Sequence, residues 1–343
     1  MNVLVVSNMG SKPSNPSLGL FVDNQVAALR RILDNVCYFK MTYNGDGFTH
    51  KLLKYPVFFF KFFLTHILSK TKYDIIHIHY YYPTIYAAFL YKYLRNRNVK
   101  VVVTCHGGDI YHYAPPNFLY RKLSYLVDHW IFTSEKLRER FYRALRNSSV
   151  ICAGYNSAVY KYSGNDTKQY DCVLVGSLDY NKGIDRLIRL INECPSLTFA
   201  VAGKGPFQSE LEKLEVSVSN FKYFGSLPPE QLKNLVSSAH LLISLSRKES
   251  FGLVISEAHA LGVPCIATMT DGSLTQIDNK QFLISQKPEE LITDRLYKAI
   301  RHFIEKNEVQ KQKTILHSIQ SAERFSLTEV SNSIKRCYES LLR

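Results

Sequence analysis

Short apolar runs bounded by Gly, Pro, Asn or Ser recur along the whole chain, with helix-length segments of mixed polarity between them. Runs that are apolar at every position, rather than at every second one, are typical of parallel strands covered on both faces. Six runs occupy residues 3–7, 36–40, 74–80, 100–107, 129–134 and 149–154, and six more occupy 172–177, 197–203, 221–227, 241–246, 264–269 and 282–285. The sequence therefore predicts an α/β fold with two parallel sheets.

A polar stretch, KYSGNDTKQYD (161–171), separates the two groups of six runs and has the character of a linker. Six strands on either side of it predict two Rossmann-like βα domains. The length of 343 residues suits two domains of about 150 residues each. We expect the first domain over 1–160 and the second over 168–322. Such folds bind ligands beyond the carboxyl ends of their strands and in clefts between domains, so functional residues should directly follow the runs.

Positive charge is concentrated in the first half of the chain. Residues 1–150 hold 20 Lys and Arg against 8 Asp and Glu, whereas residues 151–343 hold 23 against 21. This asymmetry indicates a polyanionic partner, either nucleic acid or an anionic membrane surface, although ordinary solubilising charge is the alternative.

The cysteines and the first residues bear on the cellular compartment. The seven cysteines never form a C-x-x-C pair and fall mostly within apolar runs, which favours reduced thiols over zinc sites or disulfides. The apolar start, residues 3–6, is too short for a secretory signal. We therefore expect a cytoplasmic protein.

Glycine-rich and charged motifs follow four of the runs. They are HGGD (106–109), VGSLDYNKGIDRLI (175–188), AGKGP (202–206) and SRKESFGLVISEAHALGVP (246–264). The last motif carries Glu257 within a helix that is otherwise apolar, where a solvated stripe is a poor explanation for it.

The order and spacing of these motifs resemble glycosyltransferase family 4, nucleotide-sugar-dependent enzymes of the two-domain GT-B architecture. Glu249 to Gly252, Glu257-Ala258 and Gly262 to Pro264 match the family pattern E-x-F-G-x-x-x-x-E-A with its trailing G-x-P. The resemblance extends through LGLFVDNQVAAL (18–29), YDIIHIHY (73–80), SEKLRER (134–140), ICAGYNSAVY (151–160) and RFSLTEVSNSIKRCYESLL (324–342). It implies two Rossmann-like domains facing across a cleft, an N-terminal one for the acceptor and a C-terminal one for the nucleotide sugar. The C-terminal helix, about 325–343, would cross back to the N-terminal domain.

The resemblance implies a role for each motif residue. The catalytic residues would be Lys182 at the diphosphate and Glu249 and His106 at the transferred sugar. The donor-binding residues would be Gly19, Gly176, Ser177, Lys182, Gly203, Gly205, Phe251, Gly252, Leu253, Val254 and Glu257. Gly107 and Asp109 would lie on the acceptor side, and we interpret His77 and His79 as scaffold.

Elementary chemistry supports the central assignments. If Phe251 starts a helix, the backbone N–H groups near Gly252 to Val254 are unpaired donors at a positive dipole end, a natural seat for a diphosphate. Glu257, further along, could accept hydrogen bonds from the ribose hydroxyls. The alternative is that Glu249 only complements the helix dipole and that Glu257 is a paired core carboxylate.

The chain departs from the family pattern at two positions near the expected donor. Ser177 follows the loop glycine where an arginine is common, so Lys182 would share the diphosphate with another cation, with Arg247 and Lys248 as candidates, or bind it more weakly. Gln276 replaces a glutamate, keeping an acceptor and losing a charge.

The resemblance implies a retaining hexosyltransferase in which the diphosphate leaves from the face that the acceptor attacks. No Asp-x-Asp pair follows a strand, so we expect no metal. We also expect no cofactor, because the nucleoside-diphosphate-sugar is a co-substrate.

The stretch HKLLKYPVFFFKFFLTHILSKTK (50–72) bears on the acceptor. Aromatic residues flanked by lysines suit a helix at a membrane interface, and the run is too short to span a bilayer. The alternative is a helix buried against the first sheet. Together with the basic half, this stretch predicts peripheral binding to the inner face of the cytoplasmic membrane, a lipid-linked or soluble glycan as acceptor, and a role in bacterial surface polysaccharide such as lipopolysaccharide.

Other classes fit less well. A nucleic-acid-binding protein would interleave basic residues with exposed aromatic ones, whereas most of the 23 tyrosines fall in strand or helix patterns, so we expect no nucleic-acid partner. An NAD-dependent oxidoreductase would need G-x-G-x-x-G after the first run, which SNMGSKPSNPSLG (7–19) lacks. An inactive nucleotide-sugar-binding relative, and an epimerase or phosphorylase of the same architecture, remain open.

Overall fold

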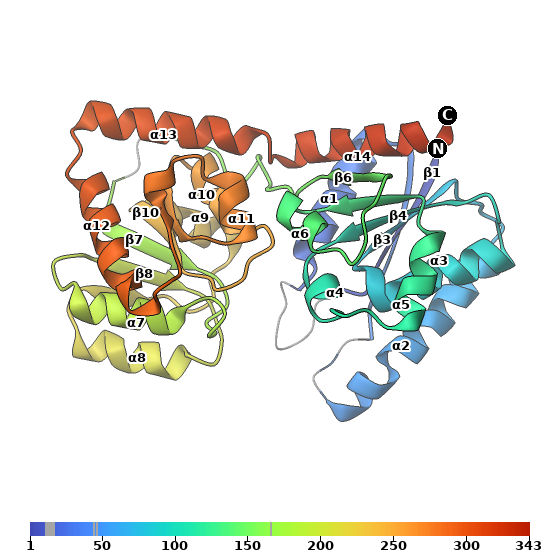
Figure 1. The fold of residues 1–343 in the computed structure, drawn as a ribbon, viewed down its shortest axis with the longest axis horizontal. Coiled ribbons are helices and arrows are strands. Elements are labelled where there is room, and N and C mark those ends of the chain that lie inside the picture. The colour runs from blue at the N-terminus through green and yellow to red at the C-terminus, as the bar shows by residue number, and fades with distance from the viewer. Residues whose placement is uncertain (11–17, 44, 46, 165–166) are drawn as a thin grey trace. The chain divides into compact units, whose positions relative to one another are not determined.

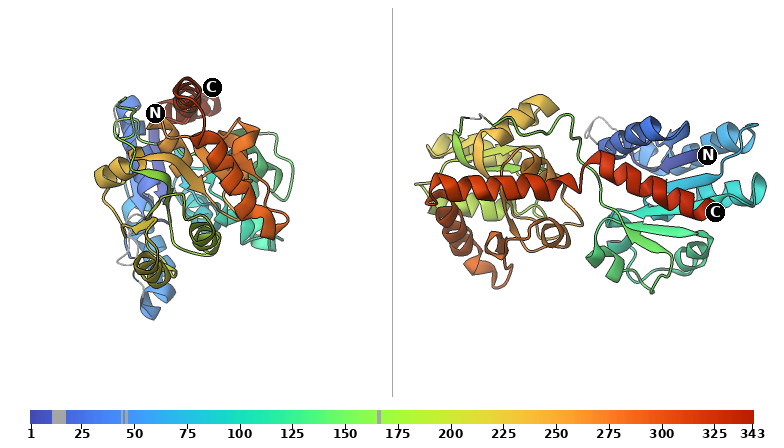
Figure 2. Two further views of the ribbon diagram at one scale, coloured as in Figure 1. Left: turned by 90° about the vertical axis from the view of Figure 1, so that its left-hand side faces the viewer. Right: turned by 90° about the horizontal axis from the view of Figure 1, so that it is seen from above.

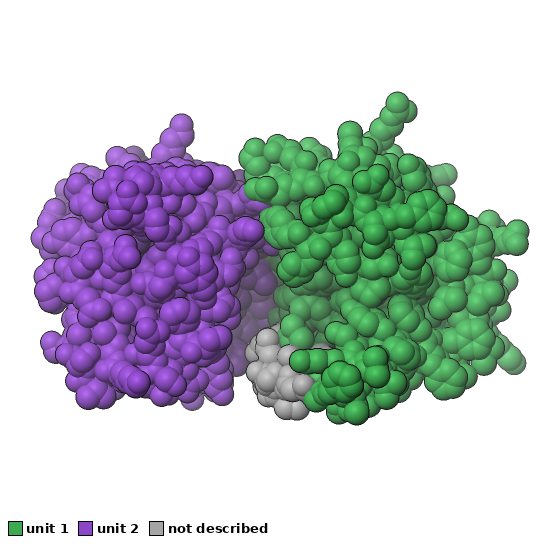
Figure 3. Space-filling model, turned by 60° about the horizontal axis from the view of Figure 1, so that its bottom comes forward, with its two compact units in different colours: residues 1–154, 327–343 green, residues 155–326 purple. Residues whose placement is uncertain are grey.

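The computed structural model describes residues 1–10, 18–43, 45, 47–164 and 167–343. The chain divides into two compact units, residues 1–154 with 327–343 (unit 1) and residues 155–326 (unit 2) (Figures 1 and 3). Each unit is built around one six-stranded sheet in which every pair of neighbouring strands is parallel.

The sheet of unit 1 has the strand order β2-β1-β3-β4-β5-β6. Its strands are β1 (Asn2–Ser7), β2 (Asn35–Lys40), β3 (Ile75–His79), β4 (Lys100–Cys105), β5 (His129–Phe132) and β6 (Ser148–Val150). The central strands β1 and β3 are buried at nearly every position, which explains their continuous apolar runs.

Two helical layers cover this sheet, because alternate side chains of each strand point to opposite faces. Val3 and Val5 pack with α1 (Leu20–Ile32) and α14 (Leu327–Leu342), whereas Leu4 and Val6 belong to the core on the other face. That face carries α2 (Phe48–Phe62), the π-helix η1 (Phe63–Ile67), α3 (Tyr81–Leu94) and α5 (Phe118–Leu123). The short helices α4 (Gly108–Tyr111), η2 (Ser124–Leu126) and α6 (Glu135–Glu139) complete the unit.

The sheet of unit 2 has the strand order β12-β11-β10-β7-β8-β9. Its strands are β7 (Tyr170–Val175), β8 (Phe199–Ala202), β9 (Phe221–Tyr223), β10 (Ala239–Ser244), β11 (Cys265–Thr268) and β12 (Leu283–Ile284). Its helices are α7 (Ile184–Glu193), α8 (Gln208–Ser217), α9 (Pro229–Ser237), α10 (Leu253–Ala260), α11 (Asp271–Gln276), η3 (Lys280–Phe282), η4 (Glu289–Leu291), α12 (Ile292–Ile304) and α13 (Glu308–Glu323).

The last two helices belong to different units (Figure 2). Helix α13 packs on α10 in unit 2, whereas α14 packs on α1 in unit 1. The hydroxyl of Tyr338 on α14 is fully buried and lies 2.6 Å from Nδ1 of His77 on β3. This contact fixes the C-terminal helix to the first sheet, as predicted.

The predicted fold class is confirmed, since each of the twelve predicted runs overlaps one strand of the two parallel sheets, although β1, β2, β6, β7 and β10 begin before their runs. The strands are shorter than several of the runs, which continue into the loops at their carboxyl ends. Of the predicted linker, residues 165 and 166 lie outside the described residues. The assignment of acceptor binding to the first domain and donor binding to the second stays a prediction. Within the described ranges, no helix combines the length and the apolar character needed to cross a bilayer.

Candidate functional site

The motifs of unit 2 occupy loops at the carboxyl ends of β7, β8 and β10, where ligands of such sheets bind. The loops after β7 and β8 are joined through their backbones. The N–H of Gly176 donates to the carbonyl of Ala202 at 3.1 Å, and the N–H of Leu178 donates to that of Lys204 at 2.9 Å.

This pairing of loops explains two of the predicted glycines. A Cβ on Gly203 would lie 1.8 Å from the carbonyl oxygen of Gly176, and one on Gly205 would lie 2.4 Å from that of Leu178. Neither position has room for a side chain. The glycines are therefore required for the loops to approach each other, and their contact with a nucleotide stays a prediction.

Helix α10 begins at Leu253, so the expectation that Phe251 starts it is wrong. Gly252 is the residue before the first helical turn and is left-handed, with φ of 80°. The ring of Phe251 is buried against Phe325 instead. The first helical N–H groups, which have no intrahelical partner, therefore belong to Leu253 and Val254.

Lys182 and Glu249 meet directly, although 67 residues separate them. The Lys182 ammonium forms an ion pair with Oε2 of Glu249, and the side chains are 27% and 18% exposed. A Cβ on Gly252 would lie 3.1 Å from Cγ of Glu249, which places this carboxylate next to the start of α10. Two of the three predicted catalytic residues and the predicted diphosphate seat are thus neighbours.

The departure at Ser177 has a local partner. Its hydroxyl donates to Oδ2 of Asp179 at 2.7 Å, and the other oxygen of Asp179 accepts the backbone N–H of Lys182 at 2.9 Å. Ser177 thus supports the turn that carries Lys182 and supplies no positive charge.

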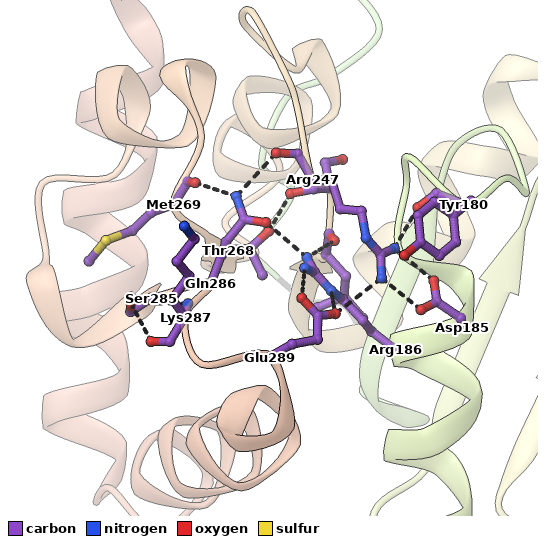
Figure 4. Close-up of polar contacts among 12 residues, drawn as sticks. Tyr180, Asp185, Arg186, Arg247, Thr268, Met269, Ser285, Gln286, Lys287 and Glu289 are labelled. Carbon is purple, nitrogen blue, oxygen red and sulfur yellow. Dashed lines mark hydrogen bonds and ion pairs between the residues drawn. The ribbon is translucent and has the colours of Figure 1, made fainter.

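Arg247 takes part in a charge network that the sequence did not reveal (Figure 4). Its guanidinium donates to both oxygens of Asp185 at 2.8 Å and to Oε1 of Glu289 at 3.1 Å, and it lies 3.6 Å from the ring centroid of Tyr180. Burial raises the pKa of Asp185, but hydrogen bonds and charge from Arg247 outweigh burial and hold that pKa below its ordinary value. Arg247 is therefore engaged in tying α7 to the loop after β10, and the other candidate cation, Lys248, is exposed.

The second arginine of the network is buried. Arg186 is 5% exposed and donates to both carboxylate oxygens of Glu289 at 2.7 and 2.6 Å and to the carbonyl of Leu245 at 2.9 Å. Two arginines and two carboxylates thus hold α7, η4 and the loop after β10 together. No sequence signal links residues so far apart, which is why this network was missed.

Gln276, the second departure from the family pattern, has a structural reason. Its side chain is buried, its amide nitrogen donates to the carbonyls of Phe251 and Gly252, and its amide oxygen accepts the hydroxyl of Ser256. A glutamate carboxylate could not donate to these carbonyls. Gln276 therefore fixes the loop that precedes α10.

Glu257 lies on α10 and is half-buried. Burial raises the pKa of its carboxyl to about 7, although a hydrogen bond from the Tyr160 hydroxyl lowers it. The carboxyl of Glu257 is thus partly shielded from water, and near neutral pH it can exchange a proton. Its contact with ribose stays a prediction.

In unit 1, His106 follows β4 and its loop is built around the buried carboxylate of Asp109. One oxygen of Asp109 accepts the backbone N–H groups of His106 and Gly107, both at 3.0 Å, and the other accepts that of Tyr81 at 2.9 Å. Burial raises the pKa of Asp109, while these donors lower it. Asp109 thus orients the His106 loop, and Gly107 has a positive φ of 107° at the start of α4. Their place on the acceptor side stays a prediction.

Of the two histidines interpreted as scaffold, His79 contacts His106. Nδ1 of His79 lies 3.0 Å from Nε2 of His106, whereas His77 contacts Tyr338 and Thr104.

Gly19, the remaining predicted donor residue, precedes α1 with φ of 88°. A Cβ on Gly19 would lie 3.1 Å from Cβ of Met9.

Among residues 1–10, 18–43, 45, 47–164 and 167–343, no group of three or more His, Cys, Asp or Glu side chains is arranged to hold a metal ion.

Comparison with known proteins gives matches over both units. The family model "Glycosyltransferase Family 4" matches residues 43–158, and "Glycosyl transferases group 1" matches residues 160–315. The chain is 25% identical over 228 residues to the gpi3 subunit of phosphatidylinositol N-acetylglucosaminyltransferase from Schizosaccharomyces pombe, covering 63% of this chain and only 49% of that protein. The chain thus matches about half the length of that relative.

Solved structures resemble the fold over the full length of the chain. Sucrose-phosphate synthase from Thermosynechococcus elongatus superposes with a TM-score of 0.77 at 18% identity, covering 100% of this chain and 99% of that one. HepE from Anabaena in complex with UDP and glucose superposes with a TM-score of 0.73 at 19% identity, covering 99% and 100%.

Proposed function

The chain belongs to glycosyltransferase family 4, and we propose that it transfers a sugar from a nucleoside diphosphate donor with retention of the anomeric configuration. The observation that carries the proposal is the meeting of Lys182 and Glu249 beside the first turn of α10. A sugar diphosphate can be bound by such a set of groups. The cation and the helix N-terminus suit the diphosphate, and the carboxylate suits the sugar hydroxyls.

In the proposed reaction, the bond between the anomeric carbon and the diphosphate oxygen breaks while the acceptor hydroxyl forms its new bond on the same face. The Lys182 ammonium and the N–H groups of Leu253 and Val254 would neutralise the charge that develops on the leaving diphosphate. The acceptor proton would pass to that leaving oxygen, so no separate strong base is required. Glu249 and His106 would bind sugar hydroxyls, and Glu257 would accept from the ribose.

We further propose that UDP carries the sugar. HepE binds UDP in its complex structures, and the S. pombe relative is named for N-acetylglucosamine transfer to phosphatidylinositol. The proposed reaction needs no metal, because Lys182 and the helix amides supply the positive charge.

The acceptor is proposed to be lipid-linked, because unit 1 exposes large apolar side chains on α2, η1, α3, α5 and η2 and at Leu68, directly after η1. These side chains are Phe48, Leu52, Leu53, Phe60, Phe63, Leu64, Leu68, Phe89, Tyr93, Leu94, Phe118, Leu119 and Tyr125. Helix α2 packs Phe58 and Phe62 inward and exposes Phe60, and η1 directly after it exposes Leu64, so this segment is both part of the core and available at the surface. We call these thirteen side chains the apolar face.

The charge around the apolar face suits anionic lipid. Residues 47–127 contain eleven Lys and Arg but only two carboxylates, Asp74 and Asp109, and Asp109 is buried. Aromatic and aliphatic side chains with surrounding lysines favour the membrane interface. We therefore propose peripheral binding to an anionic, cytoplasm-facing membrane surface and an acceptor of the kind used in bacterial surface polysaccharide.

Calorimetric titration of UDP, GDP and ADP without metal tests the donor site. We expect UDP to bind and the Glu257→Ala variant to lose at least tenfold in affinity, since a ribose contact to a carboxylate is worth about 1.5–3 kcal/mol. Binding of none of the three nucleotides to the folded chain would refute the proposal. Binding of UDP without transfer from UDP-glucose or UDP-N-acetylglucosamine to any lipid-linked acceptor would instead indicate an inactive relative.

Vesicle sedimentation tests the membrane proposal. We expect binding to vesicles containing phosphatidylglycerol and little binding to phosphatidylcholine alone. The double variant Phe60→Ser, Leu64→Ser should bind at least about tenfold more weakly, because two apolar side chains no longer leave water. Val309→Ser, at an apolar position on α13 that is even more exposed than Phe60 and Leu64, is the control. Equal binding by native chain and double variant, or binding to a DNA oligonucleotide alone, would contradict membrane docking.

A further inference from the structure

His79 lies at the end of β3 with no exposed surface, and its ring lies edge to edge with that of His106, with 5.2 Å between centroids and 20° between the ring planes. Its Nδ1 lies 3.0 Å from Nε2 of His106. Its other nitrogen, Nε2, is buried and has no hydrogen-bond partner among the residues that the structure describes. The two imidazoles therefore share one hydrogen bond, whose direction depends on which ring carries the proton.

Both rings are neutral near pH 7. Burial lowers the pKa of His79 to about 3, and burial followed by the charge of His79 lowers the pKa of His106 well below its ordinary value. A neutral imidazole carries one N–H and one bare nitrogen. Only two arrangements of the pair are therefore possible.

The two arrangements differ in what they leave buried. If His106 donates from Nε2, His79 must carry its own proton on Nε2, and a buried N–H is left without an acceptor. If His79 donates from Nδ1, only a bare nitrogen is buried at Nε2. Buried N–H groups without an acceptor are the rarer case in proteins. The second arrangement should therefore prevail by about tenfold or more.

We propose that His79 is a positioning residue that donates its Nδ1–H to Nε2 of His106 and so holds His106 as the Nδ1–H tautomer. Resting on the proposed function, this makes His106 a hydrogen-bond donor to a sugar hydroxyl at Nδ1. It also removes Nε2 of His106 as a base for the acceptor proton, in keeping with a reaction in which the leaving diphosphate takes that proton.

Two further contacts fix the orientation of the His106 ring. Tyr80 stacks on it with centroids 4.7 Å apart, and Phe21 meets it edge-on at 5.0 Å. Tyr80 is the one described non-glycine residue with a positive φ, 64°. Such a conformation is uncommon for a tyrosine, and here it accompanies the placement of the Tyr80 ring against the ring of His106.

Nitrogen-15 NMR of histidine-labelled protein tests the tautomer without reference to activity. The chain has 11 histidines, and the signals of His106 are assigned by their loss in His106→Gln. We expect a protonated Nδ1 and a bare Nε2 for His106. His79→Leu should yield a mixture of tautomers, whereas His79→Asn, which retains a donor near the position of Nδ1, should preserve the native pattern. His129→Asn, a half-buried histidine of the same sheet that contacts Ser149, is the control. A protonated Nε2 on His106 would overturn the proposal.

Sugar transfer provides the second readout. His79→Leu should lower kcat about tenfold or more with an unchanged Kd for UDP, and His79→Asn should recover most of the loss. An unchanged kcat in His79→Leu would overturn the positioning role. If the native protein transfers no sugar, the proposed function fails, whereas the NMR pattern still decides the tautomer.

Discussion

Lys182 and Glu249 form an ion pair that joins the loop after β7 to the loop before α10. The charge of the ammonium is thus balanced by a carboxylate of the chain itself. A diphosphate arriving at the start of α10 would compete with Glu249 for this ammonium. In the proposed function, binding of the nucleotide would therefore exchange the anionic partner of Lys182.

This exchange predicts that removing the charge of Glu249 and removing the charge of Lys182 change the affinity for UDP in opposite directions. Glu249→Gln should bind UDP about threefold to tenfold more tightly, because an uncharged amide no longer competes for Lys182. Lys182→Met should bind UDP about tenfold to a hundredfold more weakly, because a charge-assisted hydrogen bond is lost. Calorimetric titration measures both effects, and both variants should lose sugar transfer.

A second ion pair of unit 2 provides the control. Lys222 and Glu215 are 2.8 Å apart, on β9 and α8, away from the loops at the start of α10. Lys222→Met and Glu215→Gln should leave UDP affinity within twofold of native. Weaker UDP binding by Glu249→Gln would show that the carboxylate does not compete with the diphosphate.

The half-buried Glu257 predicts a pH dependence of stability. Its carboxyl pKa rises from 4.5 to about 7 on folding, so the native chain binds more protons than the unfolded chain between these values. Stability should therefore fall as pH rises through this window, by up to roughly 3 kcal/mol for a shift of this size. Urea unfolding of unit 2 at pH 5 and pH 8, followed for native chain and Glu257→Gln, measures the effect.

The same group predicts the opposite trend for nucleotide binding. If the ionised carboxylate accepts from ribose, UDP affinity should rise between about pH 6 and pH 8. In Glu257→Gln, neither the stability nor the UDP affinity should depend on pH in this way, since an amide does not titrate. Identical pH profiles for native chain and variant would remove Glu257 as their source.

The sheets were predictable because a strand with helices on both faces must be apolar at every position, as Val3 to Val6 are. The motifs after β7, β8 and β10 were also predictable, because parallel strands place their carboxyl ends at one edge. The partners of these motifs were not. Arg247 meets Asp185 and Gln276 meets Phe251 only after folding, across 62 and 25 residues of chain. The start of α10 at Leu253 likewise depends on Gln276, which holds the carbonyl groups ahead of the helix.

Because Arg186 is buried, removing the carboxylate of its partner Glu289 is predicted to lower the stability of unit 2. Glu289→Ala removes the carboxylate that accepts from both ends of this 5% exposed guanidinium. Because the bond to Leu245 remains and Glu289 is itself half-exposed, we expect a loss of about 1–2 kcal/mol, less than for a fully buried pair. Glu290→Ala, at the exposed neighbouring glutamate, should cost less than about 0.5 kcal/mol. Denaturant unfolding compares them, and equal losses would show that the network does not stabilise unit 2.

Alanine substitutions at two glycines of unit 2 separate two possible reasons for glycine in the loop that carries Lys182. One reason is close packing against a neighbouring loop, and the other is the left-handed backbone conformation. Gly183 and Gly225 are both left-handed, with φ of 72° and 64°. A Cβ on Gly183 would lie 2.2 Å from the carbonyl oxygen of Leu245, whereas one on Gly225 would meet nothing within 4 Å. Gly225→Ala should therefore cost only the strain of a left-handed alanine, about 1–2 kcal/mol.

Gly183→Ala should cost about 3 kcal/mol or more, because the loop after β10 must also move away from α7. That movement would shift Glu249 relative to Lys182, so UDP affinity should change in Gly183→Ala and stay native in Gly225→Ala. Thermal unfolding and UDP titration of the two variants distinguish these effects. Equal destabilisation by the two alanines would mean that the left-handed conformation alone explains Gly183, and that the loops of Lys182 and Glu249 are not held by their mutual approach.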